Sequence, residues 1–438
     1  MLSVPSLRRG RRAASTGRTM SKVDMTVLAK KEYPSVLRNK HFRRLCAAQF
    51  ISLVATYAIY FASMALVEEI THSSAQMGLM IFSSTLPGLL FGLLAGVVVD
   101  RYERVKVMMG ANIMRALVAL AFTAAVYFFP HIYLLLTIYL TNFCLSALAQ
   151  FVISAEGATI PYLVGEKRLM AANSVFNVSS LASQGAGLIV LAPLLLKLSG
   201  AEAVGLVGVI LYLAAFIVVI RLPRENKVRK PGQGRRLAEI WVELKEGWRF
   251  ISSDRLVTLA TLQLTFTSML TLMLSTLAPG FVDRVLGIEI ADAVYMAVPV
   301  GVGFGLGIAL VGRRGELLSK EKWISLGFIM LGLGLIALPF LTSVSGPFLF
   351  IMAMVVFAIG LGLALITIPA KTILQERPPA GMRGRVISTQ LVLGNAASTL
   401  PMPLGGGLAD LIGIRKTIFI LACITLGAAA ASIRQIRG

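Results

Sequence analysis

Apolar residues in this chain occur in long blocks, without the strict alternation that marks a half-buried strand. A helix needs about 20 apolar residues to cross the hydrocarbon core of a bilayer. Twelve blocks approach or exceed that length: residues 45–67, 77–99, 107–129, 132–155, 171–196, 204–220, 256–280, 293–312, 324–342, 348–370, 386–408 and 417–433. The pattern predicts an all-α membrane protein with 12 transmembrane helices.

The longest polar interruption lies in the middle of the chain, at residues 221–255. Its first part is rich in Pro and Gly, which break helices, and residues 235–251 then show helical periodicity. This second part predicts an amphipathic helix on the membrane surface, and a helix that docks a partner is the alternative. The apolar face consists of Leu237, Ile240, Trp241, Leu244, Trp248 and Ile251.

Six blocks precede this linker and six follow it, which predicts two pseudo-symmetric six-helix bundles. An offset of 215 residues places Gly88 and Gly92 on Gly303 and Gly307. The predicted organisation is a basic tail (1–44), a first bundle (45–220), a linker (221–255), a second bundle (256–433) and a short tail (434–438).

Composition agrees with a membrane protein, because 56% of the residues are hydrophobic and 14% are charged. A soluble domain carries roughly 25% charged residues. The net charge of +21 is concentrated in the N-terminal tail, the linker and alternate loops. This asymmetry predicts a multi-pass protein of the plasma membrane with both termini in the cytoplasm, and it explains the charge without nucleic acid. The other loops hold only four cations: Lys197, Arg284, Arg415 and Lys416.

The chain shows no pattern typical of an enzyme or of a cofactor protein. Its three histidines are scattered, and its three cysteines lie within apolar blocks without metal or redox spacing. The glycine-rich stretch 301–312 lacks a nucleotide-binding fingerprint. We therefore expect no catalytic site, metal site or cofactor.

The stretch 88–106, GLLFGLLAGVVVDRYERVK, joins glycines at every fourth position to a cluster of charges. Such glycines allow close helix approach, and a carboxylate beside cations can form a breakable latch. The stretch resembles the loop between helices 2 and 3 of the major facilitator superfamily, with Glu103 where that family usually has glycine. The residues that match are Gly96, Asp100, Arg101, Arg104 and Lys106.

This resemblance implies two six-helix repeats around a central substrate site, with the stretch 88–106 at the inner gate. We expect the gate to comprise Gly92, Gly96, Asp100, Arg101, Arg104, Lys106 and Arg115. Asp100 would accept hydrogen bonds from residues 385–388 at the start of helix 11, and from Arg104 or Arg115. For Arg115, pairing with Asp100 or Glu156 is favoured over substrate contact.

Several further segments are similar to the branch that holds macrolide efflux proteins and enterobactin exporters: residues 49–52, 112–117, 146–151, 155–164, 171–174, 375–377 and 382–386. The branch implies a monomer that exports a lipophilic or amphiphilic small molecule by proton antiport. A siderophore exporter, a lysophospholipid transporter, a membrane enzyme and a transport-inactive receptor are the alternatives. The fifth block lacks the Gly-Pro pair of many drug–proton antiporters, which weakens the case for proton coupling.

Polar residues within the apolar blocks are the candidates for coupling and for substrate contact. Glu156 and Asp283 are the candidate proton carriers, although Glu156 could equally be a structural partner of Arg115 or Lys167. More than half of the uncharged candidates are expected to form helix–helix hydrogen bonds. The candidates for the substrate cavity are Gln49, Ser52, Thr56, Tyr60, Asn142, Gln150, Asn177, Gln263, Thr267 and Asn395.

Overall fold

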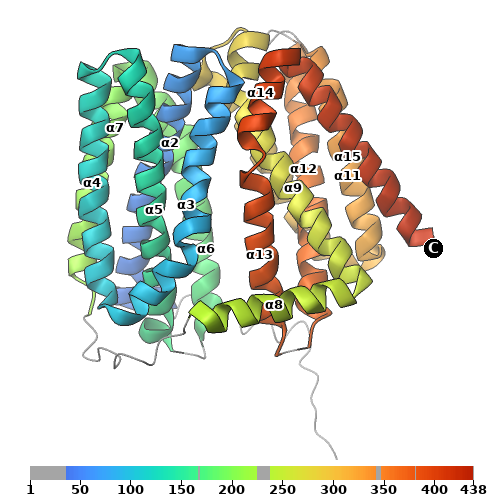
Figure 1. Ribbon diagram of the computed structural model, residues 1–438, viewed down its shortest axis with the longest axis horizontal. Helices are drawn as coiled ribbons and strands as arrows, with labels where there is room; N and C mark the ends of the chain where they lie inside the picture. Colours follow the sequence, from blue (N-terminus) through green and yellow to red (C-terminus); the bar gives the residue numbers. More distant parts are fainter. Residues whose placement is uncertain (1–35, 166–167, 224–236, 342–346, 380, 438) are drawn as a thin grey trace, which may run out of the picture.

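The computed structural model describes residues 36–165, 168–223, 237–341, 347–379 and 381–437, and in these ranges it is helical throughout, without strands (Figure 1). Ten helical stretches are long and apolar enough to cross a membrane. One of them, Leu169–Ile220, is two crossings, because Gly200 (φ 84°) breaks the helix. The predicted eleventh block forms two shorter helices in succession, and with these the described residues provide twelve candidate crossings.

The helices cover the predicted apolar blocks and extend most of them into their polar flanks. The first half contains α2 (Lys40–Thr71), α3 (Ser74–Arg101), α4 (Arg104–Phe128), α5 (His131–Val164), α6 (Leu169–Gly185), the π-helix η2 (Ala186–Leu191) and α7 (Ala192–Ile220). The amphipathic α8 (Leu237–Ser253) follows, as the sequence predicts.

The second half repeats this plan. It contains α9 (Arg255–Gly280), η3 (Phe281–Val285), η4 (Ile290–Ala293), α10 (Val294–Arg314), η5 (Gly315–Leu317), α11 (Lys320–Ala337), η6 (Leu338–Phe340), α12 (Pro347–Glu376), α13 (Arg383–Thr399), α14 (Met402–Ile412) and α15 (Ile414–Arg437).

Local sequence marks the two halves at equivalent positions. Asn39 and Asp254, which are 215 residues apart, each cap the first helix of a half with a side-chain oxygen that accepts two backbone N–H groups. In the second half, Gly303 and Gly307 allow α10 to pack closely on α12. Gly88 and Gly92 instead lie near the side chain of Gln150 in α5, so their row does not bring two backbones together in this conformation.

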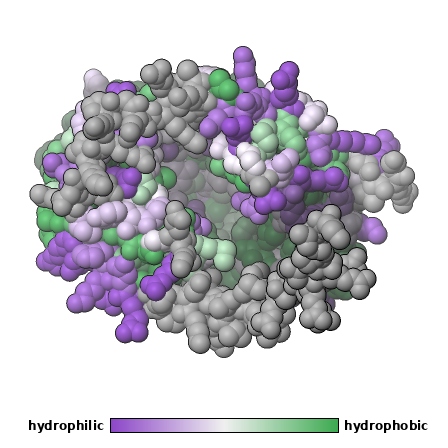
Figure 2. Space-filling model, turned by 90° about the horizontal axis from the view of Figure 1, so that it is seen from below, coloured by the Kyte–Doolittle hydropathy of each residue, from purple (hydrophilic) through white to green (hydrophobic). Residues whose placement is uncertain are grey.

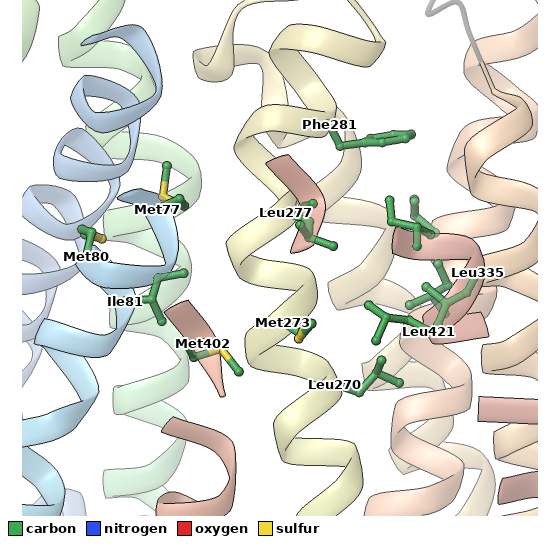
Figure 3. Packing of buried hydrophobic residues seen from close by; sticks show 14 of the residues in the cluster. Met77, Met80, Ile81, Leu270, Met273, Leu277, Phe281, Leu335, Met402 and Leu421 are labelled. Carbon is green, nitrogen blue, oxygen red and sulfur yellow. The ribbon is translucent and has the colours of Figure 1, made fainter. Parts of the chain in front are cut away.

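The two halves are joined at one end of the molecule, here called the closed end, and they separate at the other, called the α8 end. The larger apolar core runs through both halves, and Met77, Met80 and Ile81 of α3 are fully buried in it with Met402 of α14 (Figure 3). The second apolar core contains only residues 36–222, all from the first half. Seen from the α8 end, the molecule is hollowed between its halves (Figure 2).

Helix α8 crosses beneath the second half at the α8 end (Figure 1). Ile251 is buried and Leu244 is partly buried, whereas Trp241 and Trp248 remain exposed at 66% and 53%. Exposed tryptophans on an amphipathic helix are typical of a membrane–water interface, where the ring is partly apolar. Leu237 and Ile240 belong to the predicted apolar face, but their side chains lie outside the described part.

Candidate functional site

At the closed end, Arg284 of η3 connects the two halves. Its Nε lies 2.8 Å from a carboxylate oxygen of Glu68 in α2, and its guanidinium donates to Ser74 Oγ at 2.7 Å. The same guanidinium lies 3.6 Å from Asp410 of α14. Because Glu68 is only 1% exposed, Arg284 supplies a cation to a carboxylate that water barely reaches.

Asp410 adds a second connection between the halves, since it caps α3. Its carboxylate accepts from Ser73 Oγ at 2.6 Å and from the backbone N–H groups of Ser74 and Ala75 at 2.8 and 2.9 Å. A carboxylate at a helix N-terminus is stabilised by the unpaired N–H groups and by the helix dipole. Lys197 and Asp292 form a further ion pair between the halves at this end.

Two glycines make this contact close. A Cβ on Gly406 of α14 would clash with the carbonyl oxygen of Ser74, and one on Gly78 of α3 would lie 2.6 Å from the carbonyl oxygen of Met402. The glycines therefore let α3 and α14 approach at backbone distance, as small residues do where membrane helices pack.

At the α8 end, the predicted inner-gate residues lie in the first half. Arg104 donates to the carbonyl oxygen of Ala158 at 2.8 Å, and Lys106 pairs with Glu103 at 2.9 Å. Asp100 lies in the last turn of α3 and is partly buried, and Arg101, which ends the helix, is exposed. A Cβ on Gly96 would meet nothing within 4 Å, so no helix packs against that side of α3 here.

The proposed partner of Asp100 is held elsewhere in this conformation. Arg385, in the first turn of α13, forms an ion pair with Glu246 of α8. Thr389 donates to the carbonyl oxygen of Leu244 at 3.2 Å, and Gly247 packs directly on the backbone of Arg385. Helix α8 is thus fixed to the start of α13, and the link from Asp100 to residues 385–388 stays a prediction for the opposite conformation.

A buried polar network occupies the core of the first half. Arg115 is 1% exposed, donates to Ser52 Oγ at 2.7 Å and lies over the ring of Tyr212. Glu156, at 5% exposure, is close enough to interact electrostatically with Arg115. No direct hydrogen bond between the two side chains is seen, and the structural pairing of Arg115 with Asp100 or Glu156 stays a prediction.

Many of the candidate cavity residues contribute hydrogen bonds within a half. Ser52 donates to Asn112 at 3.1 Å. A role in substrate binding stays a prediction for all of the cavity candidates. The other such contacts are Gln49 to Ser180 (2.6 Å), Thr56 with Tyr212 (2.9 Å), Asn142 to Ser63 (2.9 Å), Gln263 to Ser432 (3.3 Å) and Thr267 to the carbonyl oxygen of Gln263 (2.7 Å).

The four candidates not named above differ in accessibility. Asn177 of α6 and Asn395 of α13 are exposed, and Tyr60 and Gln150 are partly buried. An exposed amide within an apolar helix is costly against lipid but favourable in a wet cleft. Asn177 and Asn395 are therefore the strongest remaining cavity candidates, one from each half.

Asp283 lies at the closed end, 3.3 Å from His72 Nδ1, and not in the core where a central proton carrier would sit. Sequence reasoning missed Glu68 and Asp410 and treated Arg284 only as a loop cation. The sequence did offer one signal for a role of these residues at an end of the bundle: Glu68, Arg284 and Asp410 all lie just past the ends of apolar blocks. Nothing in the sequence showed that the three ends meet.

Comparisons with known proteins agree with this architecture. The family model described as Major Facilitator Superfamily matches residues 45–401. A curated relative, the uncharacterized MFS-type transporter YfiS of Bacillus subtilis (strain 168), is 25% identical over 400 residues, which cover 90% of this chain and 93% of the relative.

Two solved structures share the fold at low sequence identity. The nucleoside transporter NupG superposes with a TM-score of 0.70 at 12% identity, covering 91% of this chain and all of that one. A bacterial homologue of the human lysosomal transporter Spinster, in an inward-facing and unoccupied conformation, superposes with a TM-score of 0.63 at 16% identity, covering 92% and 96%. The family match and the helical architecture lead to one conclusion: this chain belongs to the major facilitator superfamily of membrane transporters.

Proposed function

We propose that the protein is a secondary active transporter that exports a lipophilic or amphiphilic small molecule by alternating access. The observation that carries the proposal is the asymmetry of its two ends. Ion pairs and backbone packing join the halves at the closed end, and the halves separate around a hollow at the α8 end (Figure 2). Described loops rich in Lys and Arg, at residues 101–106, 313–322, 377–379 and 381–385, lie at the α8 end, so the positive-inside rule assigns that end to the cytoplasm. The conformation is then inward-facing.

The chemistry of the hollow supports an amphiphilic cargo. Figure 2 shows hydrophilic side chains on parts of its rim and hydrophobic side chains further in. The exposed amides of Asn177 and Asn395 offer neutral hydrogen-bonding groups. Arg115, the cation deepest in the apolar blocks, is engaged within the first half. A cleft with hydrophobic side chains in its interior suits a macrolide-like or lipophilic molecule better than a polyanion.

Transport in inside-out vesicles tests this function. The panel contains a lipophilic dye, a macrolide and a nucleoside, the last because NupG shares the fold. We expect a pH gradient with an acidic vesicle interior to drive accumulation of the dye or the macrolide inside the vesicles. A proton ionophore should abolish this accumulation. Accumulation identical to that in vesicles without the protein, for every compound and gradient, would contradict the proposal.

The buried carboxylate of Glu156 carries a narrower prediction about coupling. If Glu156 exchanges a proton during the cycle, Glu156→Gln reduces proton release when the cargo binds to the detergent-solubilised protein. Glutamine keeps the shape of the side chain and removes the exchangeable charge. A weakly buffered indicator measures the release, with Glu202→Gln at a partly exposed site as the control. Equal release from wild type and Glu156→Gln would exclude Glu156 as the carrier.

The inner gate gives two predictions of opposite sign. In an outward-facing state Asp100 would compete with Glu246 for Arg385, so Asp100→Ala should favour the inward-facing state and Glu246→Gln the outward-facing one. Partly exposed ion pairs contribute roughly 0.2–1 kcal/mol, so each shift should be at most about fivefold. Spin labels at Tyr102→Cys and Gly384→Cys, one on each half, report the opening as a distance. Shifts of the same sign in both variants would refute the competition.

A further inference from the structure

Three side chains of types that commonly bind metal ions come from opposite halves of the chain and meet at the closed end. Glu68 and His72 are one turn apart at the end of α2, and Asp283 comes from η3 in the second half. One donor atom from each residue lies within 4.8 Å of those of the other two, and His72 Nδ1 is 3.3 Å from Asp283 Oδ2. The histidine is held there because it caps α2 in a left-handed conformation (φ 44°). The sequence hides this cluster, since Asp283 lies far along the chain from Glu68 and His72.

The donor set selects one class of ion. An imidazole nitrogen with two carboxylates suits Zn²⁺ and its neighbours among the first-row transition metals, whereas Mg²⁺ and Ca²⁺ prefer oxygen donors alone. Zn²⁺ binds such ligands at about 2.0–2.2 Å, which places neighbouring donors roughly 3.3 Å apart in a tetrahedron. The His72–Asp283 separation already has this value, and the donor atom of Glu68, within 4.8 Å of the other two, would have to move closer to complete the set.

Charge and hydrogen bonding point to a missing cation as well. Glu68 and Asp410 share one guanidinium, that of Arg284, and Asp283 lies beside His72, so with a neutral imidazole these side chains carry three negative charges and one positive charge. Glu68 is 1% exposed, and its ion pair with Arg284 leaves both carboxylate oxygens without a well-directed hydrogen bond. A buried carboxylate in this condition is a strong metal ligand, because a bound cation offsets its desolvation.

We propose that Glu68, His72 and Asp283 form a binding site for a divalent transition-metal ion such as Zn²⁺. The ion completes its shell with water and competes with Arg284 for Glu68, while Arg284 keeps Ser74 and Asp410 as partners. Since the ligands come from both halves, bound Zn²⁺ fastens the closed end. The binding stands on geometry alone. Its consequence, arrest in the inward-facing state, rests on the proposed alternating access.

Calorimetric titration of the purified full chain with Zn²⁺, after treatment with a chelator, tests the site without any cargo. We expect one saturable site in wild type, weakened about tenfold or more by His72→Ala and by Asp283→Asn. His131→Ala, at an exposed histidine on the same end of the molecule, is the matched control and should bind as wild type. No saturable binding in wild type, or equal affinity in all four proteins, would overturn the proposal. A failed transport panel would leave this result unaltered.

A second readout follows the conformation. Arg284→Ala removes the guanidinium beside Glu68, and Zn²⁺ should replace its charge. Labels at Tyr127→Cys and Leu411→Cys report the separation of the halves at the closed end. We expect Zn²⁺ to restore the short distance in Arg284→Ala and to have no effect once His72→Ala is added. A distance that Zn²⁺ leaves unaltered in Arg284→Ala would overturn the fastening role.

Discussion

Replacing Arg284 by alanine is expected to open the closed end and to shift the protein towards an outward-facing state. The substitution leaves Glu68 buried without its cation and removes one of the groups that link α2, α3 and α14. Removing one partner of a buried ion pair costs roughly 3–5 kcal/mol. Because Arg284 itself is partly exposed, we take the lower bound of about 3 kcal/mol, which changes the ratio of the two states more than 100-fold.

The Tyr127–Leu411 label pair measures this shift in a background where Cys46, Cys144 and Cys423 are serine. Adding Glu68→Gln should recover much of the short distance, because the buried charge then disappears together with its partner. Lys416→Ala removes an exposed cation from the same end and should leave the distance unchanged. If the double variant opens as far as Arg284→Ala alone, the ion pair does not hold the gate.

The second large effect is expected from a single methyl group. Gly406→Ala places a Cβ against the carbonyl oxygen of Ser74, and a backbone atom cannot turn away as a side chain can. The helices α3 and α14 must move apart, which loosens the hydrogen bonds from Ser73, Ser74 and Ala75 to Asp410. Overpacking of this kind costs about 1–3 kcal/mol, a shift of roughly 5- to 150-fold towards the outward-facing state.

Gly407→Ala is the matched control, since a Cβ there meets nothing within 4 Å. The same label pair across the closed end should lengthen in Gly406→Ala and stay as in wild type in Gly407→Ala. Alanine has the higher helix propensity, so both variants gain equally from that source and the comparison isolates the steric term. Identical distances in the two variants would show that close packing at Gly406 does not decide the conformation.

Periodicity alone predicted the membrane helices and α8, because a bilayer imposes length and apolarity on each crossing separately. It also predicted that many polar side chains would bond helix to helix, as Ser52 and Asn142 do. The pairing of Arg115 with Glu156 was favoured for a related reason, since a charge at that depth needs a partner. These predictions concern the length and apolarity of single helices, or the need of polar and charged side chains in a membrane for a partner, which holds for any arrangement of the helices.

The closed-end contacts could not be predicted in the same way. Arg284, Glu68 and Asp410 each resemble an ordinary charge at the end of an apolar block. Their meeting depends on how the halves tilt, which is set by packing spread over many residues and by the conformation that the molecule adopts. The π-helix η3 adds to the difficulty, because it changes the direction in which Asp283 and Arg284 project relative to a regular α9.

The interruption between α13 and α14 has a consequence for the sequence of events during transport. Helix α13 ends at Thr399 and α14 begins at Met402, with Pro401 between them, so the two segments are not one rigid rod. Helix α14 carries Asp410 and Gly406 at one end, and α13 carries Arg385 at the other. Under the proposed alternating access, bending at this point would allow the α8 end to close before the closed end opens. The cycle would then pass through an occluded intermediate, in which the cargo is enclosed and no open path crosses the bilayer.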